Sequence, residues 1–157
     1  MSNVFYPPQN ICKRDFTKKS IFLAGTIDMG NSKDWQSETI DLIHYRYGPH
    51  HFNILNPRRK DWDSSWVQEY QNPTFYQQVN WELGALNAAD VIIVYFAAGS
   101  QSPITLMELG LYANSGKCVV VCEDGFWRKG NVEIVCDNYD IPMYESIKDA
   151  VNELVFV

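Results

Sequence analysis

The sequence predicts a single α/β domain with a doubly wound, mostly parallel sheet flanked by helices. The apolar runs are continuous rather than alternating, as in ADVIIVYF at 89–96 and CVVVC at 118–122, which is typical of strands buried on both faces. A segment with helical spacing separates each run from the next, so neighbouring strands should run parallel. A chain of 157 residues has room for one such domain and not for two.

The expected elements alternate along the chain after an N-terminal extension of residues 1–19, and the domain itself spans 20–157. The strands are expected at 20–26, 51–55, 89–96 and 118–122, and the main helices end at Gly48 or cover 73–88 and 103–116. Asn31 or Ser32 can cap the first helix, and Asn72 and Ser102 each precede a proline as N-cap residues of the next two.

The C-terminal part is less distinct. Residues 131–139 fit both a helix and a strand, and the helical spacing of Val132, Val135 and Tyr139 favours a helix. A short extended piece at 141–144 and an amphipathic helix from Ile147 should complete the fold.

Net charge and the length of the apolar runs limit which partners the protein can bind. The formal charge of −6 argues against binding to long nucleic acid, because that affinity comes mainly from clustered Lys and Arg. The sequence has neither an apolar run of the roughly 20 residues that span a bilayer nor an apolar N-terminal signal. We therefore expect a cytoplasmic protein with a small-molecule ligand and no membrane partner.

The usual signals for metals and cofactors do not appear in the sequence. The four cysteines lack paired CxxC spacing and should be reduced thiols, and the three histidines lack ligand spacing. The segment GTIDMG at 25–30 is neither GxGxxG nor a P-loop. The sequence thus predicts neither a bound metal nor a cofactor.

Ligands of parallel sheets bind beyond the carboxyl ends of the strands. This rule selects four loops, at 25–30, 56–66, 97–102 and 123–129. Aromatic residues make up 14% of the chain, and several of their rings lie in or near these loops, where they could stack on a planar ligand.

Two glutamates occupy positions that should be apolar. Glu108 lies four residues after Ile104 and three before Leu111, so the helical pattern turns it toward the interior. On the preceding helix, Glu82 lies three residues after Val79 and four before Leu86, again on or beside the apolar face. A buried carboxylate costs several kcal/mol unless it is paired, and the pattern fits buried ion pairs and a working site about equally well. Nearby rings, hydroxyls and amides favour a site for glycosyl chemistry.

The chain resembles the nucleoside 2-deoxyribosyltransferase family and its N-glycosidase relatives. The likeness rests on FLAGTID, NWELGALNAADVIIVYF and above all SPITLMELGLYANSGKCVVV, and it extends from about Ser20 to Val135. It implies a flavodoxin-like fold, a homo-oligomer and a double displacement in which Glu108 attacks C1′ of the sugar. Glu82 matches an acidic position that assists the sugar or the base. Ser102 stands near a place where the transferases often carry Asp, which leaves transfer and hydrolysis both open.

The resemblance and the four loops together give the expected contacts with a nucleoside or nucleotide. Besides Glu108 and Glu82, the expected substrate-binding residues are Gly25, Thr26, Asp28, Trp35, Asn56, Arg58, Asp61, Phe96, Ser100, Ser102 and Met107. Arg59, Arg128 and Lys129 belong to two basic spots that should meet at the site and could grip a 5′-phosphate. Two other functions stay open, namely a nucleotide sensor without catalysis and cleavage of a nicotinamide-type glycosidic bond.

Overall fold

The computed structural model describes residues 3–27, 33–59, 61 and 65–156. Within them the strands form one parallel sheet in the order β1-β3-β2-β4-β5-β6. The strands are β1 Val4–Phe5, β2 Ser20–Gly25, β3 Asn53–Leu55, β4 Val91–Phe96, β5 Cys118–Cys122 and β6 Met143–Tyr144.

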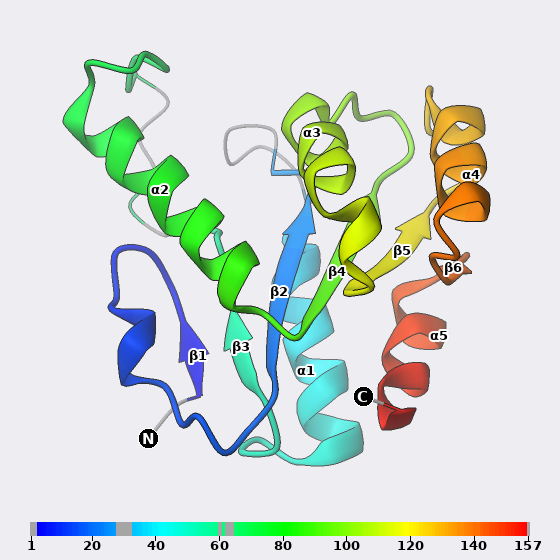
Figure 1. The fold of residues 1–157 in the computed structure, drawn as a ribbon, viewed down its shortest axis with the longest axis horizontal. Coiled ribbons are helices and arrows are strands. Elements are labelled where there is room, and N and C mark those ends of the chain that lie inside the picture. The colour runs from blue at the N-terminus through cyan, green and yellow to red at the C-terminus, as the bar shows by residue number, and fades with distance from the viewer. Residues whose placement is uncertain (1–2, 28–32, 60, 62–64, 157) are drawn as a thin grey trace.

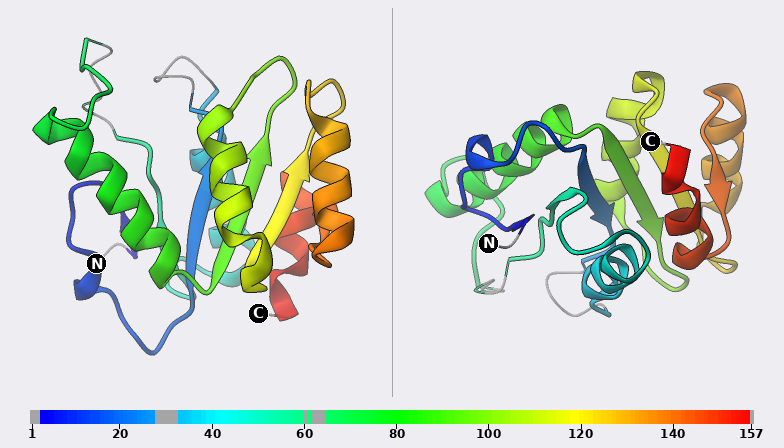
Figure 2. Two further views of the ribbon diagram at one scale, coloured as in Figure 1. Left: turned by 45° about the horizontal axis from the view of Figure 1, so that its top comes forward. Right: turned by 90° about the horizontal axis from the view of Figure 1, so that it is seen from below.

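Helices cover both faces of this sheet (Figure 1). The α-helices of the described chain are α1 Trp35–Tyr47, α2 Pro73–Ala88, α3 Pro103–Tyr112, α4 Lys129–Asn138 and α5 Ile147–Asn152. Short 3-10 turns are η1 Ile11–Lys13, η3 Ala113–Ser115 and η4 Glu153–Phe156. Helices α2, α3 and α4 lie on one face, whereas α1 and α5 lie on the other (Figure 2).

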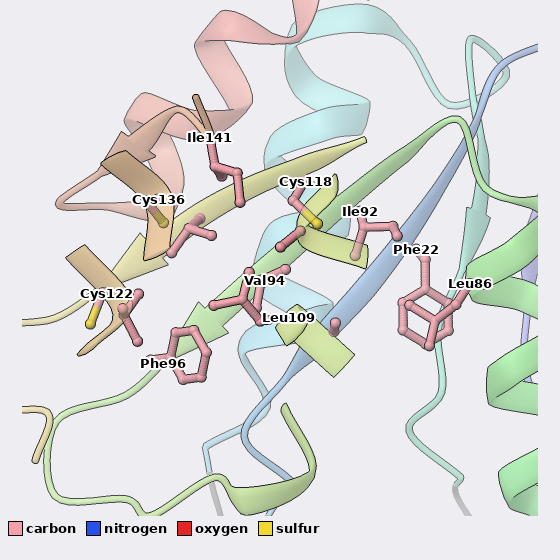
Figure 3. Packing of buried hydrophobic residues seen from close by; sticks show 14 of the residues in the cluster. Phe22, Leu86, Ile92, Val94, Phe96, Leu109, Cys118, Cys122, Cys136 and Ile141 are labelled. Carbon is pink, nitrogen blue, oxygen red and sulfur yellow. The ribbon is translucent and has the colours of Figure 1, made fainter. Parts of the chain in front are cut away.

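Each helical layer buries its own apolar cluster against the sheet. On the α2–α4 side, Phe22 and Leu86 pack at one end of the cluster and Cys136 and Ile141 at the other (Figure 3). On the opposite side, Trp35 of α1 belongs to one buried cluster with aliphatic side chains of β2, β4 and α5. The sheet is therefore buried on both faces, as its continuous apolar strands predict.

The predicted α/β class and the alternation of strands and helices are confirmed. Residues 131–139 fall mainly in helix α4, so the helical interpretation of this ambiguous segment is correct. Asn72 caps α2, since its side chain accepts from the amides of Thr74 and Phe75. No helix among the described residues is long and apolar enough to cross a membrane.

Two predicted boundaries are wrong. Helix α1 begins at Trp35, and its N-cap is Asp34, whose carboxylate accepts from the amide of Ser37. Asn31 and Ser32, the expected caps, lie outside the described residues. Helix α3 ends at Tyr112, where the chain tightens into η3 before Gly116 adopts a positive φ of 75°.

The segment before Ser20 contains an edge strand that the sequence analysis does not predict. Strand β1 pairs with β3, with Val4 opposite Ile54. The same segment contacts α2, where the indole Nε1 of Trp81 donates to the carbonyl of Gln9 at 2.8 Å. These contacts attach the N-terminal segment to the sheet and to α2.

The strand order reverses beside β2. The chain runs from β2 to β3 on one side and returns through α2 to β4 on the other. Apart from the edge strand β1, this is the flavodoxin-like order, in which ligands bind where the order switches. Helices α2 and α3 flank this point, and they carry the two inward glutamates.

Candidate functional site

Glu108 is buried on helix α3, with only 9% of its surface exposed. Thr105 and Leu109 are the other buried residues of this helix, so they mark its inner face. Ile104 and Leu111, which the helical pattern places inside, are instead 56% and 57% exposed. The burial of Glu108 agrees with the prediction, but the apolar stripe used to predict it lies on the outer face.

Glu82 lies on the neighbouring helix α2 and is partly buried. One turn earlier, the amide of Gln78 donates from Nε2 to Glu82 Oε1 at 3.0 Å. Gln78 itself is only 4% exposed. Glu82 is thus a carboxylate with a neutral hydrogen-bond donor, and no described residue forms an ion pair with it.

Both carboxyl groups bind protons more tightly than ordinary glutamates. Burial raises the pKa of Glu108 to about 8, and the negative charge of Glu82 adds to this rise. Burial also raises the pKa of Glu82 to about 7, against the opposing effect of the Gln78 amide. Because the two groups repel each other as anions, these values belong to the pair, which exchanges protons near neutral pH.

Hydroxyl groups gather where β2 and β4 end. The side chains of Thr26, Ser100 and Ser102 hydrogen-bond one another, with Ser100 Oγ 3.1 Å from Thr26 Oγ1 and 2.9 Å from Ser102 Oγ. All three residues are buried. Ser102 is the N-cap residue of α3, as predicted, but its side chain makes no capping hydrogen bond. Its hydroxyl instead lies in this cluster, and its backbone adopts φ 47°. The cluster joins the start of α3 to the end of β2.

A cavity of about 360 Å³ opens beside this cluster at the carboxyl ends of β2 and β4. Its volume falls within the range of small-molecule sites. Glu123 borders it and accepts from Tyr95 Oη at 2.8 Å and from the amide of Ala98 at 3.0 Å. The lining residues are Thr26, Lys33, Tyr95, Ala97, Ala98, Gly99, Ser100 and Glu123.

The loop after β3 is held from both sides of the sheet. The Asn56 side chain accepts from the amide of Arg58 at 3.0 Å. Arg58 Nη1 reaches the α1 side, where it donates to Gln36 Oε1 at 3.2 Å. On the α2 side, Gln78 Nε2 donates to the Pro57 carbonyl at 3.1 Å. The loop therefore connects the starts of α1 and α2 next to the acid pair.

The two basic spots lie in different loops, and each contains an ion pair of its own. Arg59 pairs with Asp61 at 2.7 Å in the loop after β3, whereas Lys129 pairs with Asp124 after β5. Strands β2 and β4 separate these loops in the sheet order. Arg128 lies over the ring of Trp127 at 4.3 Å. The meeting of the two basic spots at one ligand therefore stays a prediction.

Other expected contact residues belong to the framework or face outward. A Cβ on Gly25 would lie 2.3 Å from the Trp35 ring, so glycine is needed to admit this side chain. Trp35 is 2% exposed and donates from Nε1 to the Thr26 carbonyl. Phe96 is fully buried against Phe126. Met107 is 54% exposed on the outer face of α3, and Asp28 lies outside the described residues.

Sequence reasoning missed the two buried amides that hold the loop after β3. Gln36 and Gln78 are 0% and 4% exposed, and each has one amide atom without a hydrogen-bond partner among the described residues. The one available signal was the spacing of Gln78 four residues before Glu82, which puts both on one helix face.

The described residues contain no group of three His, Cys, Asp or Glu side chains that could hold a metal ion.

The fold and this site define a class of protein, an α/β domain of flavodoxin-like order with one buried and one partly buried glutamate on the helices beside the strand switch. A family model described as nucleoside 2-deoxyribosyltransferase like matches residues 18–126. Because this match covers more than half of the chain, the protein belongs to that family.

Structural comparison supports the fold alone. A conserved protein from Enterococcus faecalis V583 is similar with a TM-score of 0.60 and 12% sequence identity, over 88% of this chain and 98% of that chain. A sequence comparison with curated proteins gives no match.

Proposed function

We propose that this protein cleaves the N-glycosidic bond of a nucleoside or nucleotide, with Glu108 as the nucleophile and Glu82 as its acidic partner. The observation that carries the proposal is the pair of inward carboxyl groups, whose pKa values burial raises to near neutrality, with the charge of Glu82 adding to the rise for Glu108. Two such groups at one site can exist as one anion and one acid, which is what a retaining displacement requires.

The proposed reaction has two steps. In the first, an ionised Glu108 oxygen bonds to C1′ while the C1′–N bond breaks and its electron pair leaves with the base. Glu82, in its protonated form, gives its proton to that base. In the second step water or another base attacks C1′ and gives a proton to the ionised Glu82, while the bond between C1′ and Glu108 breaks and Glu108 leaves as a carboxylate. Two inversions in sequence leave the sugar with its original configuration. The low-polarity surroundings of Glu108 strengthen its attraction for the positive charge that develops at C1′.

Ser102 bears on the fate of the sugar. In this chain a hydroxyl bonded to Thr26 and Ser100 stands where the transferases often carry a carboxylate. A hydroxyl in such a cluster cannot accept a proton from a base as a carboxylate can, so binding of an acceptor base has less support. Transfer and hydrolysis are separated by adding a free acceptor base and measuring whether a new nucleoside forms.

Binding of a 5′-phosphate would compete with two ion pairs. Arg59 and Lys129 already pair with Asp61 and Asp124, and these ion pairs would need to open to receive a phosphate. Parallel assays on nucleosides and their monophosphates decide the point, since a phosphate that is bound should lower KM.

The test of the proposal is release of free base, followed by chromatography, from a panel of ribo- and deoxyribonucleosides and their monophosphates. We expect the Glu108→Gln variant to lose at least about a thousandfold in kcat while it stays folded. The exposed Glu133 on α4 provides the control, and Glu133→Gln should keep full activity. A folded Glu108→Gln variant with wild-type rate would refute the nucleophile. If ligands raise Tm and are recovered unchanged, the protein is a nucleotide-binding module instead.

A further inference from the structure

Gln78 lies at the junction of the acid pair and the loop after β3. Its Nε2 donates to two acceptors, Glu82 Oε1 at 3.0 Å and the Pro57 carbonyl at 3.1 Å. A primary amide has two N–H donors, so these bonds use both. Because a backbone carbonyl can only accept, the Pro57 bond fixes which way the amide faces.

The remaining amide atom shows that this arrangement is costly. Gln78 Oε1 is buried and has no hydrogen-bond partner among the described residues. An unpaired buried acceptor costs about 1–3 kcal/mol. An apolar side chain would avoid this cost at a position that is only 4% exposed. The benefit of glutamine must therefore come from its two donors.

One of those donors acts on a single oxygen of Glu82. Because Oε1 receives the Gln78 bond, Oε2 is the atom left to hold and release a proton. No charged side chain among the described residues forms an ion pair with Glu82. The arginines of the loop after β3 contact other groups, since Arg58 donates to Gln36 and Arg59 pairs with Asp61. On the α3 side, Glu108 acts through repulsion.

We propose that Gln78 is a positioning residue, which fixes the Glu82 carboxyl group to the loop after β3 and leaves its Oε2 free to pass a proton to the departing base. This inference rests on the proposed function for its catalytic consequence. The hydrogen bond and its effect on Glu82 do not depend on that function, which allows the two to fail separately.

The test replaces Gln78 by Met, which has a similar length and no donor, and replaces the exposed neighbour Gln77 by Met as the control. A ¹³C-glutamate NMR titration follows the Glu82 carboxyl carbon, which is assigned by its loss in Glu82→Gln. In folded Gln78→Met the Glu82 midpoint should move at least about half a pH unit upward, because the anion loses its donor. In Gln77→Met it should not move.

Kinetics supply the second readout. With Gln78→Met we expect kcat to fall roughly tenfold while KM changes less than about threefold, because the acid is misplaced rather than the substrate released. The alkaline limb of kcat/KM should shift upward with the NMR midpoint. An unchanged Glu82 midpoint, or an equal shift in Gln77→Met, would overturn the inference. Absence of glycosidic cleavage in the wild type would refute the proposed function and the catalytic role of Gln78, whereas the titration would still decide the contact with Glu82.

Discussion

The residues that matter most are two carboxyl groups that change charge close to physiological pH. In the proposed reaction Glu108 must be ionised to attack C1′, whereas Glu82 must keep a proton for the leaving base. The pKa is raised to about 8 for Glu108 and to about 7 for Glu82. A single proton therefore lies mainly on Glu108, and the active form is the less populated one in which Glu82 holds the proton. Burial destabilises the two anions and thereby raises both pKa values, so the pair can hold a single proton at neutral pH.

The pH dependence of kcat/KM should therefore be bell-shaped, with limbs near 7 and 8, because doubly protonated and doubly ionised pairs are both inactive. Glu82→Gln should abolish the alkaline limb and lower the rate by about a hundredfold. Initial rates of base release across buffers of equal ionic strength measure this. A profile that is flat from pH 5 to pH 9 would contradict the assignment.

Stability should respond to pH through the same groups. The folded protein binds protons to Glu108 more tightly than the unfolded chain does, since its pKa rises from 4.5 to about 8. The free energy of unfolding should therefore fall as pH increases across that interval. Glu108→Gln removes this loss, so at pH 8 it should be more stable than wild type by on the order of 2 kcal/mol, and at pH 4.5 nearly equal. Urea unfolding at the two pH values tests this, and a variant less stable at pH 8 would contradict it.

At the scale of single elements, the end of β2 is shaped by the Trp35 ring. A Cβ added to Gly25 would meet the ring at 2.3 Å, and the indole could not move without breaking its bond to Thr26. Gly25→Ala should thus lower the free energy of unfolding by about 1–3 kcal/mol. The matched control is Gly84→Ala in α2, where nothing lies within 4 Å of the new methyl group. That control should be neutral or stabilising, and thermal unfolding of both variants checks the pair; an equal Tm for Gly25→Ala and wild type would contradict the packing.

The elements also show what the sequence could and could not predict. Strands β4 and β5 were predictable because a parallel strand buried on both faces is apolar throughout. The side of α3 that packs against the sheet could not be predicted, because PITLMELGLY is apolar on nearly every side and has two possible apolar stripes. The buried stripe contains Thr105 and Glu108, and the exposed one contains Ile104 and Leu111.

Only those residues of the candidate site could be predicted that the sequence pattern of a single helix reveals. Glu82 and Glu108 stand out as acids inside helices, so a pattern of single residues reveals them. The hydrogen bond from Gln78 to the Pro57 carbonyl joins positions 21 residues apart. The presence of a glutamine in a helix does not predict such a bond. Two strands lie between the loop that carries Arg59 and the loop that carries Lys129, and the strand sequences themselves do not specify this order.

At the scale of the whole molecule, the outer face of α3 is apolar. Ile104, Met107 and Leu111 are 56%, 54% and 57% exposed, and they follow one another at helical spacing. Apolar stripes of this kind mark contact surfaces, and a twofold homo-oligomer can cover such a stripe with its own copy. We expect light scattering to show an oligomer that Leu111→Lys converts to monomers. Tyr45→Lys, on the opposite face of the sheet, should leave the mass unchanged; a monomeric wild type would contradict the expectation.

The most direct measurement is to trap the sugar on the protein. Fluorine at C2′ of a nucleoside withdraws electrons from C1′ and slows the release of the sugar, so the intermediate should accumulate. Intact mass spectrometry should then show one added sugar per chain, and peptide mapping should place it on Glu108, with equal release of free base. Base release without an adduct, or an adduct on any other residue, would contradict the account.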